Sequence, residues 1–175
     1  MDALFSYPVA LLAACGLDLL FGDPRWLPHP VQGIGRLAVF YEGLARRCCN
    51  SEKKAGILTA VLVLGSTGLC CATILAILAL FGQATLAAGT ILILYTTIAI
   101  RDLLHHARAV YRALTVPDPA GLETAREKVA MLVGRDTARL DEAGIIRACV
   151  ESVAENMADG VIAPIFWSFV GAVLA

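Results

Sequence analysis

Four stretches of this chain are long, apolar and almost free of charge, and they limit its fold more than any other feature. They are Ala3–Phe21, Ile57–Phe81, Ala84–Ile100 and Val161–Ala175. A helix needs about 20 residues to cross a hydrocarbon core of about 30 Å, so the first three stretches are long enough to span a membrane. The fourth stops short of that length, and we therefore expect the chain to be the front part of a longer protein.

The composition agrees with a membrane protein. Hydrophobic residues make up 58% of the 175 residues and charged residues only 17%, which excludes an ordinary soluble domain. The formal net charge is -1, so the chain has no basic excess that would attract nucleic acid.

The basic residues lie in two of the segments between the apolar stretches. Of the 14 Lys and Arg residues, six lie in residues 22–56 and eight in residues 101–160. Because cytoplasmic loops carry an excess of Lys and Arg, an N-terminus outside the cell places both basic loops in the cytoplasm. The sequence therefore predicts an all-α, multi-pass protein of the cell (inner) membrane, with a single membrane domain over residues 1–175. That domain has about four transmembrane helices and a cytoplasmic helical loop.

Both loops contain helical patterns. In the first loop a helix is expected from Val31, after three prolines, and its apolar face comprises Ile34, Leu37, Ala38 and Tyr41. In the second loop the third apolar stretch is expected to continue as helix through residues 100–114, until prolines break it.

Two further helices are expected in the second loop. The apolar face of the first comprises Leu122, Ala125, Val129 and Leu132. The apolar face of the second comprises Ile146, Cys149, Val150 and Val153. Three residues can cap the start of this second helix: Asp136, Thr137 or Asp141.

The segment ESVAENMADG carries the sharpest local chemical signal. Glu151 and Glu155 lie one turn apart on the same helix face, and Asp159 follows one turn later. Hard oxygen ligands of this kind suit Mg²⁺, which proteins usually hold with one or two carboxylates and substrate phosphates. The alternative is a solvated helix face on which Arg147 offsets Glu151, and the spacing leaves both interpretations open.

The segment GRDT at residues 134–137 is a second candidate. Arg135 and the backbone N–H groups of a helix start would make a seat for phosphate, with Thr137 supplying a hydroxyl. The alternative is an ordinary end of one helix followed by the cap of the next.

The exit of the first apolar stretch is a third candidate. Asp18 lies inside the stretch, and an ionisable residue there is costly enough to indicate function, unless it pairs structurally with Arg25 or Arg36. Asp23 and His29 follow in the proline-rich turn, where His29 is either a ligand or base or a plain turn residue.

The segments DLLFGDPRWLPHPVQGIGRL at 18–37 and VGRDTARLDEAGIIRACVESVAENMADGVIAPIFW at 133–167, with the apolar stretches between them, resemble the adenosylcobinamide-phosphate synthase (cobinamide synthase) family of cobalamin biosynthesis. The resemblance is to the N-terminal portion of that family. It implies a membrane ligase that joins the corrin substrate adenosylcobyric acid to aminopropanol or its phosphate, with ATP and Mg²⁺. Other membrane enzymes of the pathway are then possible partners.

The resemblance suggests roles for the motif residues. Glu151, Glu155 and Asp159 would hold Mg²⁺, whereas Arg135 and Thr137 would contact a phosphate of the nucleotide or the amino alcohol. The corrin or its phosphate partner would be received by Arg25, His29 and Arg36. The candidate catalytic residues are Asp23, His29 and Asp136, with Asp136 or Asp23 as the base for the incoming ammonium group.

Two other functions compete with this one. Membrane prenyltransferases and alcohol phosphotransferases also place carboxylates at four-residue spacing to bind Mg²⁺-diphosphate, but they are expected to show paired aspartate-rich motifs. A non-catalytic membrane partner of the corrin pathway, or a transporter subunit, would line the middle of its spans with polar residues. Here the ionisable groups gather at the cytoplasmic edge instead.

Overall fold

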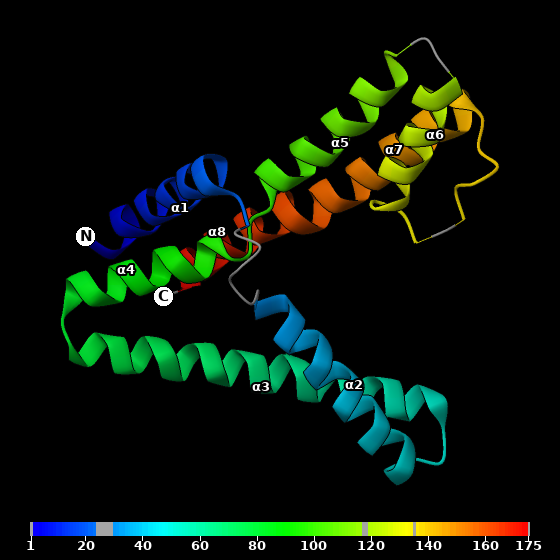
Figure 1. Cartoon of the computed structure of the whole chain (residues 1–175). Coiled ribbons are helices and arrows are strands. Elements are labelled where there is room, and N and C mark those ends of the chain that lie inside the picture. The colour runs from blue at the N-terminus through cyan, green and yellow to red at the C-terminus, as the bar shows by residue number, and fades with distance from the viewer. Residues whose placement is uncertain (1, 24–29, 117–118, 135, 175) are drawn as a thin grey trace. The chain divides into compact units, whose positions relative to one another are not determined.

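The computed structural model describes residues 2–23, 30–116, 119–134 and 136–174 (Figure 1). Every regular element in these ranges is a helix, which confirms the all-α class. The elements are α1 (Asp2–Phe21), α2 (Pro30–Cys48), α3 (Glu52–Leu80), α4 (Gln83–Tyr95), α5 (Ile100–Leu114), α6 (Pro119–Ala130), α7 (Glu142–Met157), the π-helical turn η1 (Ala158–Ile162) and α8 (Ala163–Leu174).

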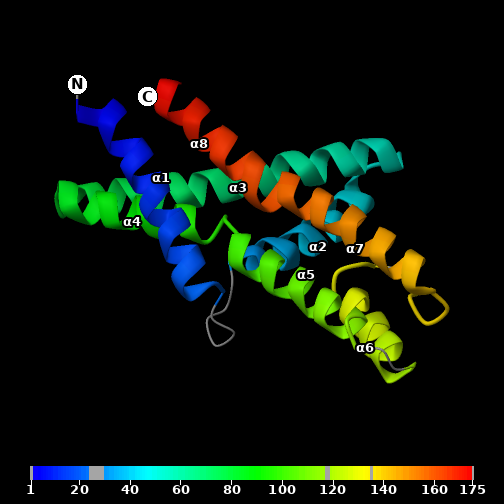
Figure 2. The same cartoon turned by 90° about the horizontal axis from the view of Figure 1, so that it is seen from above.

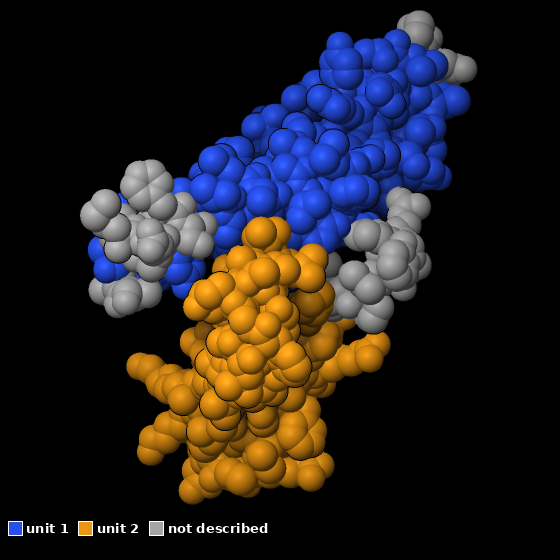
Figure 3. All heavy atoms as spheres, turned by 90° about the vertical axis from the view of Figure 1, so that its left-hand side faces the viewer, with its two compact units in different colours: residues 1–23, 93–175 blue, residues 24–92 orange. Residues whose placement is uncertain are grey.

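The chain divides into two compact units, which Figure 3 shows in different colours. Unit 1 comprises residues 1–23 and 93–175, and unit 2 comprises residues 24–92. The single membrane domain expected over residues 1–175 remains a prediction.

Unit 2 is built on the pairing of α2 with the first half of α3, which lie side by side in Figures 1 and 2. The predicted apolar face of α2 is confirmed, because its four residues are all half-buried: Ile34, Leu37, Ala38 and Tyr41. The closest packing is at small residues, where Ala45 of α2 and Ala55 of α3 are buried.

Unit 1 has its hydrophobic core where α5, α6 and α7 pack together (Figure 2). The predicted apolar face of α6 is confirmed, since Ala125 and Val129 are fully buried and Leu122 packs against them. The helix ends at Ala130, and Leu132 joins the core from the turn that follows.

The predicted apolar face of α7 was partly right, because Cys149 and Val153 are half-buried and Cys149 packs against the core. Ile145 and Ala148 are fully buried, whereas Ile146 and Val150 are exposed. Asp141 caps the helix by accepting a hydrogen bond from the Gly144 N–H at 2.8 Å, which selects one of the three predicted caps. The hydrophobic pattern was misleading because the face that meets the other helices carries a small residue, Ala148, and a hydrogen-bonded polar residue, Ser152.

Residues 100–114 form a helix that ends before the prolines, as predicted. The predicted continuity with the third apolar stretch was wrong, because the helix is interrupted between Tyr95 and Ile100. Thr97 and Ile98 N–H groups bond to carbonyls three residues back, which tightens and ends α4. The Ala99 N–H then donates to the Gly160 carbonyl at 3.0 Å instead of to its own helix.

The π turn η1 has a visible cause in the sequence. Pro164 has no N–H, so the Gly160 carbonyl has no helical donor four residues ahead, and the proline ring crowds that carbonyl. The chain widens by one residue, with the Ala163 N–H donating to the Ala158 carbonyl five residues back. The freed Gly160 carbonyl is the group that accepts from Ala99.

Two stretches of the described helices are long and apolar enough to cross a membrane. They are Glu52–Leu80 and Gln83–Leu114, the latter comprising α4 and α5. The other two predicted spans correspond to shorter apolar helices, Tyr7–Phe21 in α1 and Ala163–Leu174 in α8. The structure thus supports two of the four expected spans by length and composition.

Candidate functional site

The two motifs of the second basic loop meet at one hollow in unit 1, which we call the α7 hollow. Its volume is about 410 Å³, and it lies between the start of the GRDT segment and the acidic face of α7. The residues that line it are Leu132, Val133, Gly134, Ala148, Glu151, Ser152, Glu155 and Asn156. The fold therefore brings Gly134 to the same hollow as two carboxylates, Glu151 and Glu155, that lie 17 and 21 residues later in the chain.

The carboxylates of the hollow are accessible. Glu151 and Glu155 are both exposed, and they stand on successive turns of α7, as the spacing predicted. Two such side chains suit Mg²⁺ bound partly by substrate phosphates. Asp159, the third predicted ligand, lies in η1 and not among the lining residues. Within the described part of the chain, no three His, Cys, Asp or Glu residues form a group that could hold a metal ion by themselves.

The wall of the hollow is held by a hydrogen-bond network that sequence reasoning missed. The buried Ser152 hydroxyl donates to the Leu132 carbonyl at 2.7 Å. The Asn156 amide donates to the Ser152 hydroxyl at 3.1 Å and to the Ser152 carbonyl at 2.8 Å. The available signal in the sequence was Ser152, a polar residue on the buried face of α7, because a buried hydroxyl needs a hydrogen-bond partner.

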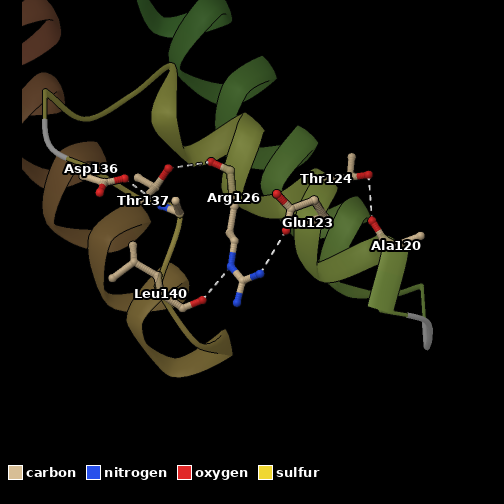
Figure 4. A network of polar contacts seen from close by, with 8 residues as sticks. Ala120, Glu123, Thr124, Arg126, Asp136, Thr137 and Leu140 are labelled. Carbon is tan, nitrogen blue, oxygen red and sulfur yellow. Dashed lines mark hydrogen bonds and ion pairs between the residues drawn. The ribbon is translucent and has the colours of Figure 1, made fainter.

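Thr137, the last residue of the GRDT segment, and Leu140 in the following loop are held against α6 (Figure 4). The Arg126 guanidinium donates to the Leu140 carbonyl at 2.8 Å and pairs with Glu123 at 2.9 Å, and the buried Thr137 hydroxyl donates to the Arg126 carbonyl at 3.1 Å. Arg126 thus contacts the loop at two points. These contacts fix the path of the chain from Thr137 to the cap of α7.

Individual predicted residues have different surroundings. Thr137 uses its hydroxyl within the fold, and the exposed Asp136 accepts a hydrogen bond from the Ala138 N–H at 2.9 Å, as in an Asx turn. Asp23 is half-buried at the end of α1 in unit 1, whereas Arg36 is exposed on α2 in unit 2. Three candidates lie outside the described residues: Arg25, His29 and Arg135. All these roles remain predictions.

A second polar junction joins α1 to the break between α4 and α5. Asp18 is fully buried, and its Oδ2 accepts from the Arg101 N–H at 3.0 Å. Of its two predicted partners, Arg25 lies outside the described residues and Arg36 lies on α2. The Arg101 guanidinium donates to the carbonyls of the last turn of α1, at Leu20 and, at 3.5 Å, Leu19. The Tyr95 hydroxyl donates to the Gly22 carbonyl. This junction holds the break beside η1, through Ala99 and Gly160.

Known proteins resemble this chain over most of its length. Residues 11–175 match the family described as CobD/Cbib protein. Cobalamin biosynthesis protein CobD of Leptospira interrogans serogroup Icterohaemorrhagiae serovar copenhageni (strain Fiocruz L1-130) is 45% identical over 160 residues, 89% of this chain and 48% of that protein. The CobD protein of Pelobacter propionicus is 44% identical over 173 residues, 96% of this chain and 51% of its own.

A relative with the other family name agrees with these two. Cobalamin biosynthesis protein CbiB of Salmonella typhimurium is 40% identical over 162 residues, 89% of this chain and 49% of that protein. The chain spans about half the length of the curated relatives it matches. No solved structure matches it.

Proposed function

The chain belongs to the CobD/CbiB family, and we propose that it serves cobalamin biosynthesis as part of a membrane ligase. The proposed reaction joins the carboxylate of adenosylcobyric acid to the amine of aminopropanol or its phosphate, giving adenosylcobinamide or its phosphate. ATP and Mg²⁺ are the proposed cofactors. The names of the relatives support the pathway, and the resemblance of the motif segments supports the reaction.

The reaction sets clear requirements for the site. A carboxylate is a poor acyl donor, so the site must accommodate ATP, whose γ-phosphoryl group would pass to the carboxylate with release of ADP. The amine would then displace phosphate from the acyl group to form the amide. Cationic groups and Mg²⁺ then balance the phosphate charge. The amine arrives as an ammonium ion and must lose a proton to a base before its lone pair can attack.

The observation that carries the proposal is the meeting of Gly134 with Glu151 and Glu155 across the α7 hollow. The two carboxylates would hold Mg²⁺, with substrate phosphates supplying further ligands. The backbone beside Gly134 would approach the phosphates closely because that residue has no side chain, and Arg135 would add a positive charge. Asp136 and Asp23 stay as candidate bases, and Arg25, His29 and Arg36 as candidate contacts to the corrin.

We also propose that the chain crosses the cell membrane several times, with its N-terminus outside and both basic loops in the cytoplasm. The two membrane-length apolar stretches and the confinement of Lys and Arg to two loops support this placement. It would put the α7 hollow in the cytoplasm, where ATP is available. Association with other membrane enzymes of the pathway is compatible with it.

The test is an amide-forming assay on membranes that contain the chain, alone or with the remaining half of the Pelobacter propionicus relative. Adenosylcobyric acid, ATP and Mg²⁺ are supplied with free or phosphorylated aminopropanol, and the product is detected by mass. We expect ATP-dependent product in at least the complemented sample. Failure with both amines, or consumption of an isoprenoid diphosphate instead, would overturn the ligase proposal.

A pair of matched variants locates the metal. Glu155→Gln keeps the size of the side chain but removes its charge, and it is expected to abolish product while the protein still inserts in membranes. Glu127→Gln makes the same change on an exposed residue of α6 outside the α7 hollow and should leave the rate unchanged. Normal activity of Glu155→Gln would contradict the metal assignment.

A further inference from the structure

Unit 2 has its own groove, between α2 and the first half of α3. Its volume is about 480 Å³. Small and apolar residues make most of its walls, and they are Ala38, Ala55, Gly56, Ala60, Val63 and Leu64. A side chain added at Gly56 would meet no atom within 4 Å at its Cβ, so the groove is open at this point.

One end of the groove is charged. Glu42 and Arg46 of α2 and Glu52 of α3 line it there, and Arg46 pairs with Glu42 at 2.7 Å and Glu52 at 3.7 Å. The adjoining cations Arg47, Lys53 and Lys54 are exposed, and no ion pair is found for them among the described residues. The groove itself is lined here by two carboxylates and one cation, and Arg47, Lys53 and Lys54 lie beside it at the turn that joins the two helices. We call this end the mouth, and it has two more cations than carboxylates when the three adjoining cations are included.

One of the two helices that form the groove, α3, is also one of the two candidate membrane spans. None of the most apolar part of α3 is buried inside the protein. On α2, Phe40 and Leu44 are exposed large hydrophobic residues. With α3 in a bilayer, the cations before its first apolar turn would lie at headgroup level and the apolar walls would lie deeper.

We propose that this groove binds an acidic glycerophospholipid, with one acyl chain along the apolar walls and the phosphate group at Arg47, Lys53 and Lys54. The charge of the mouth complements an anionic headgroup, and the apolar walls complement a hydrocarbon chain. A free phosphate compound would use the mouth but leave the groove empty. The proposal rests on the membrane placement of α3 and not on amide formation, so the two proposals can fail separately.

The test is native mass spectrometry of the purified chain in detergent. The protein is titrated with phosphatidylglycerol or with phosphatidylcholine of the same acyl chains, and with inorganic phosphate. We expect retention of phosphatidylglycerol at concentrations where neither phosphatidylcholine nor phosphate is retained. Equal retention of the two lipids would overturn the proposal, and so would competition by millimolar phosphate alone.

Two pairs of variants separate the mouth from the groove. Each cation near a membrane surface contributes about a fivefold change in affinity, so the double variant Lys53→Gln/Lys54→Gln should weaken phosphatidylglycerol binding about thirtyfold. Arg108→Gln, on the exposed side of α5, is its control for loss of charge elsewhere. Unchanged binding by the double variant would overturn the proposal.

Gly56→Leu fills the groove without changing the charge, and Gly68→Leu makes the same change at another open position of α3. We expect Gly56→Leu to reduce binding at least tenfold and Gly68→Leu to leave it unchanged. If both bind as the parent does, the acyl chain does not occupy the groove, and the proposal is wrong. Circular dichroism confirms that each variant is folded.

Discussion

Asp18 and Arg101 cap the ends of each other's helices. The Asp18 carboxylate, in the last turn of α1, accepts the Arg101 N–H in the first turn of α5, and the Arg101 guanidinium donates to carbonyls of the last turn of α1. Free N–H and C=O groups at helix ends need such partners when they are buried. The pair therefore closes two helix ends at once and joins the first apolar helix to the break before α5.

Removing the Asp18 side chain should destabilise the protein. Asp18→Ala leaves the Arg101 N–H without its acceptor at a fully buried site, which costs about 1–3 kcal/mol. Asp18→Asn keeps an oxygen acceptor and should lose less. Thermal unfolding in detergent, followed by circular dichroism, measures both, and equal midpoints for Asp18→Ala and the parent would refute the capping role.

Gly22 is expected to tolerate substitution poorly. Its φ is +60°, and an added Cβ would lie 2.9 Å from Cδ of Arg101, the side chain that caps α1. Gly22→Ala should therefore cost about 1–2 kcal/mol of unfolding free energy. Gly16→Ala, in the middle of α1 with no atom within 4 Å of the new Cβ, is the control and should be neutral or slightly stabilising. Similar midpoints for the two variants would contradict this prediction.

Ser152 is expected to position the α7 hollow without contacting substrate. Ser152→Ala leaves the Leu132 carbonyl and one Asn156 hydrogen unpaired at a buried site, at a cost of about 1–3 kcal/mol. Product formation should fall as the wall loosens, and Ser152→Thr, which keeps the hydroxyl, should recover part of it. Ser168→Ala removes a hydroxyl that bonds only within α8 and serves as the control. A fall in activity with an unchanged midpoint would argue for direct contact with substrate instead.

The thiol of Cys149 should respond to pH differently from an exposed thiol. Burial beside the core of unit 1 raises the pKa of Cys149, because the thiolate is disfavoured there. In single-cysteine variants, Cys149 should react with iodoacetamide more slowly than the exposed Cys48 at pH 8.5, with a rate that still rises above pH 9. Because the folded pKa is the higher one, the unfolded chain releases the proton first, and stability should fall as pH rises above about 8.5. Equal rates and equal pH profiles would contradict the burial of this thiol.

The parts of the fold that followed from the sequence are those governed by local pattern. The apolar faces of α2 and α6 were predicted because large side chains at helical spacing mark them, and Ile34 and Val129 are examples. The position of Glu151 and Glu155 on the same face of α7 follows from helix geometry in the same way.

The parts that could not be predicted depend on distant groups or on small residues. The partner of Asp18 is a backbone N–H 83 residues away, which no pattern of opposite charges reveals. Ala148 and Ser152 mark the packed face of α7, but hydrophobicity favoured their larger neighbours. Pro164 is a local sequence signal for η1, because a proline inside a helix removes the N–H that would bond four residues back.

The single hydrogen bond between Ala99 and Gly160 makes two backbone defects dependent on each other. Straightening the break at residues 96–99 would strand the Gly160 carbonyl, because Pro164 has nothing to donate to it. Replacing Pro164 would allow the N–H of residue 164 to bond to the Gly160 carbonyl within the helix, and the Ala99 N–H would then lack an acceptor. Neither irregularity can be repaired alone, so an insertion or substitution in one segment is tolerated only together with a compensating change in the other.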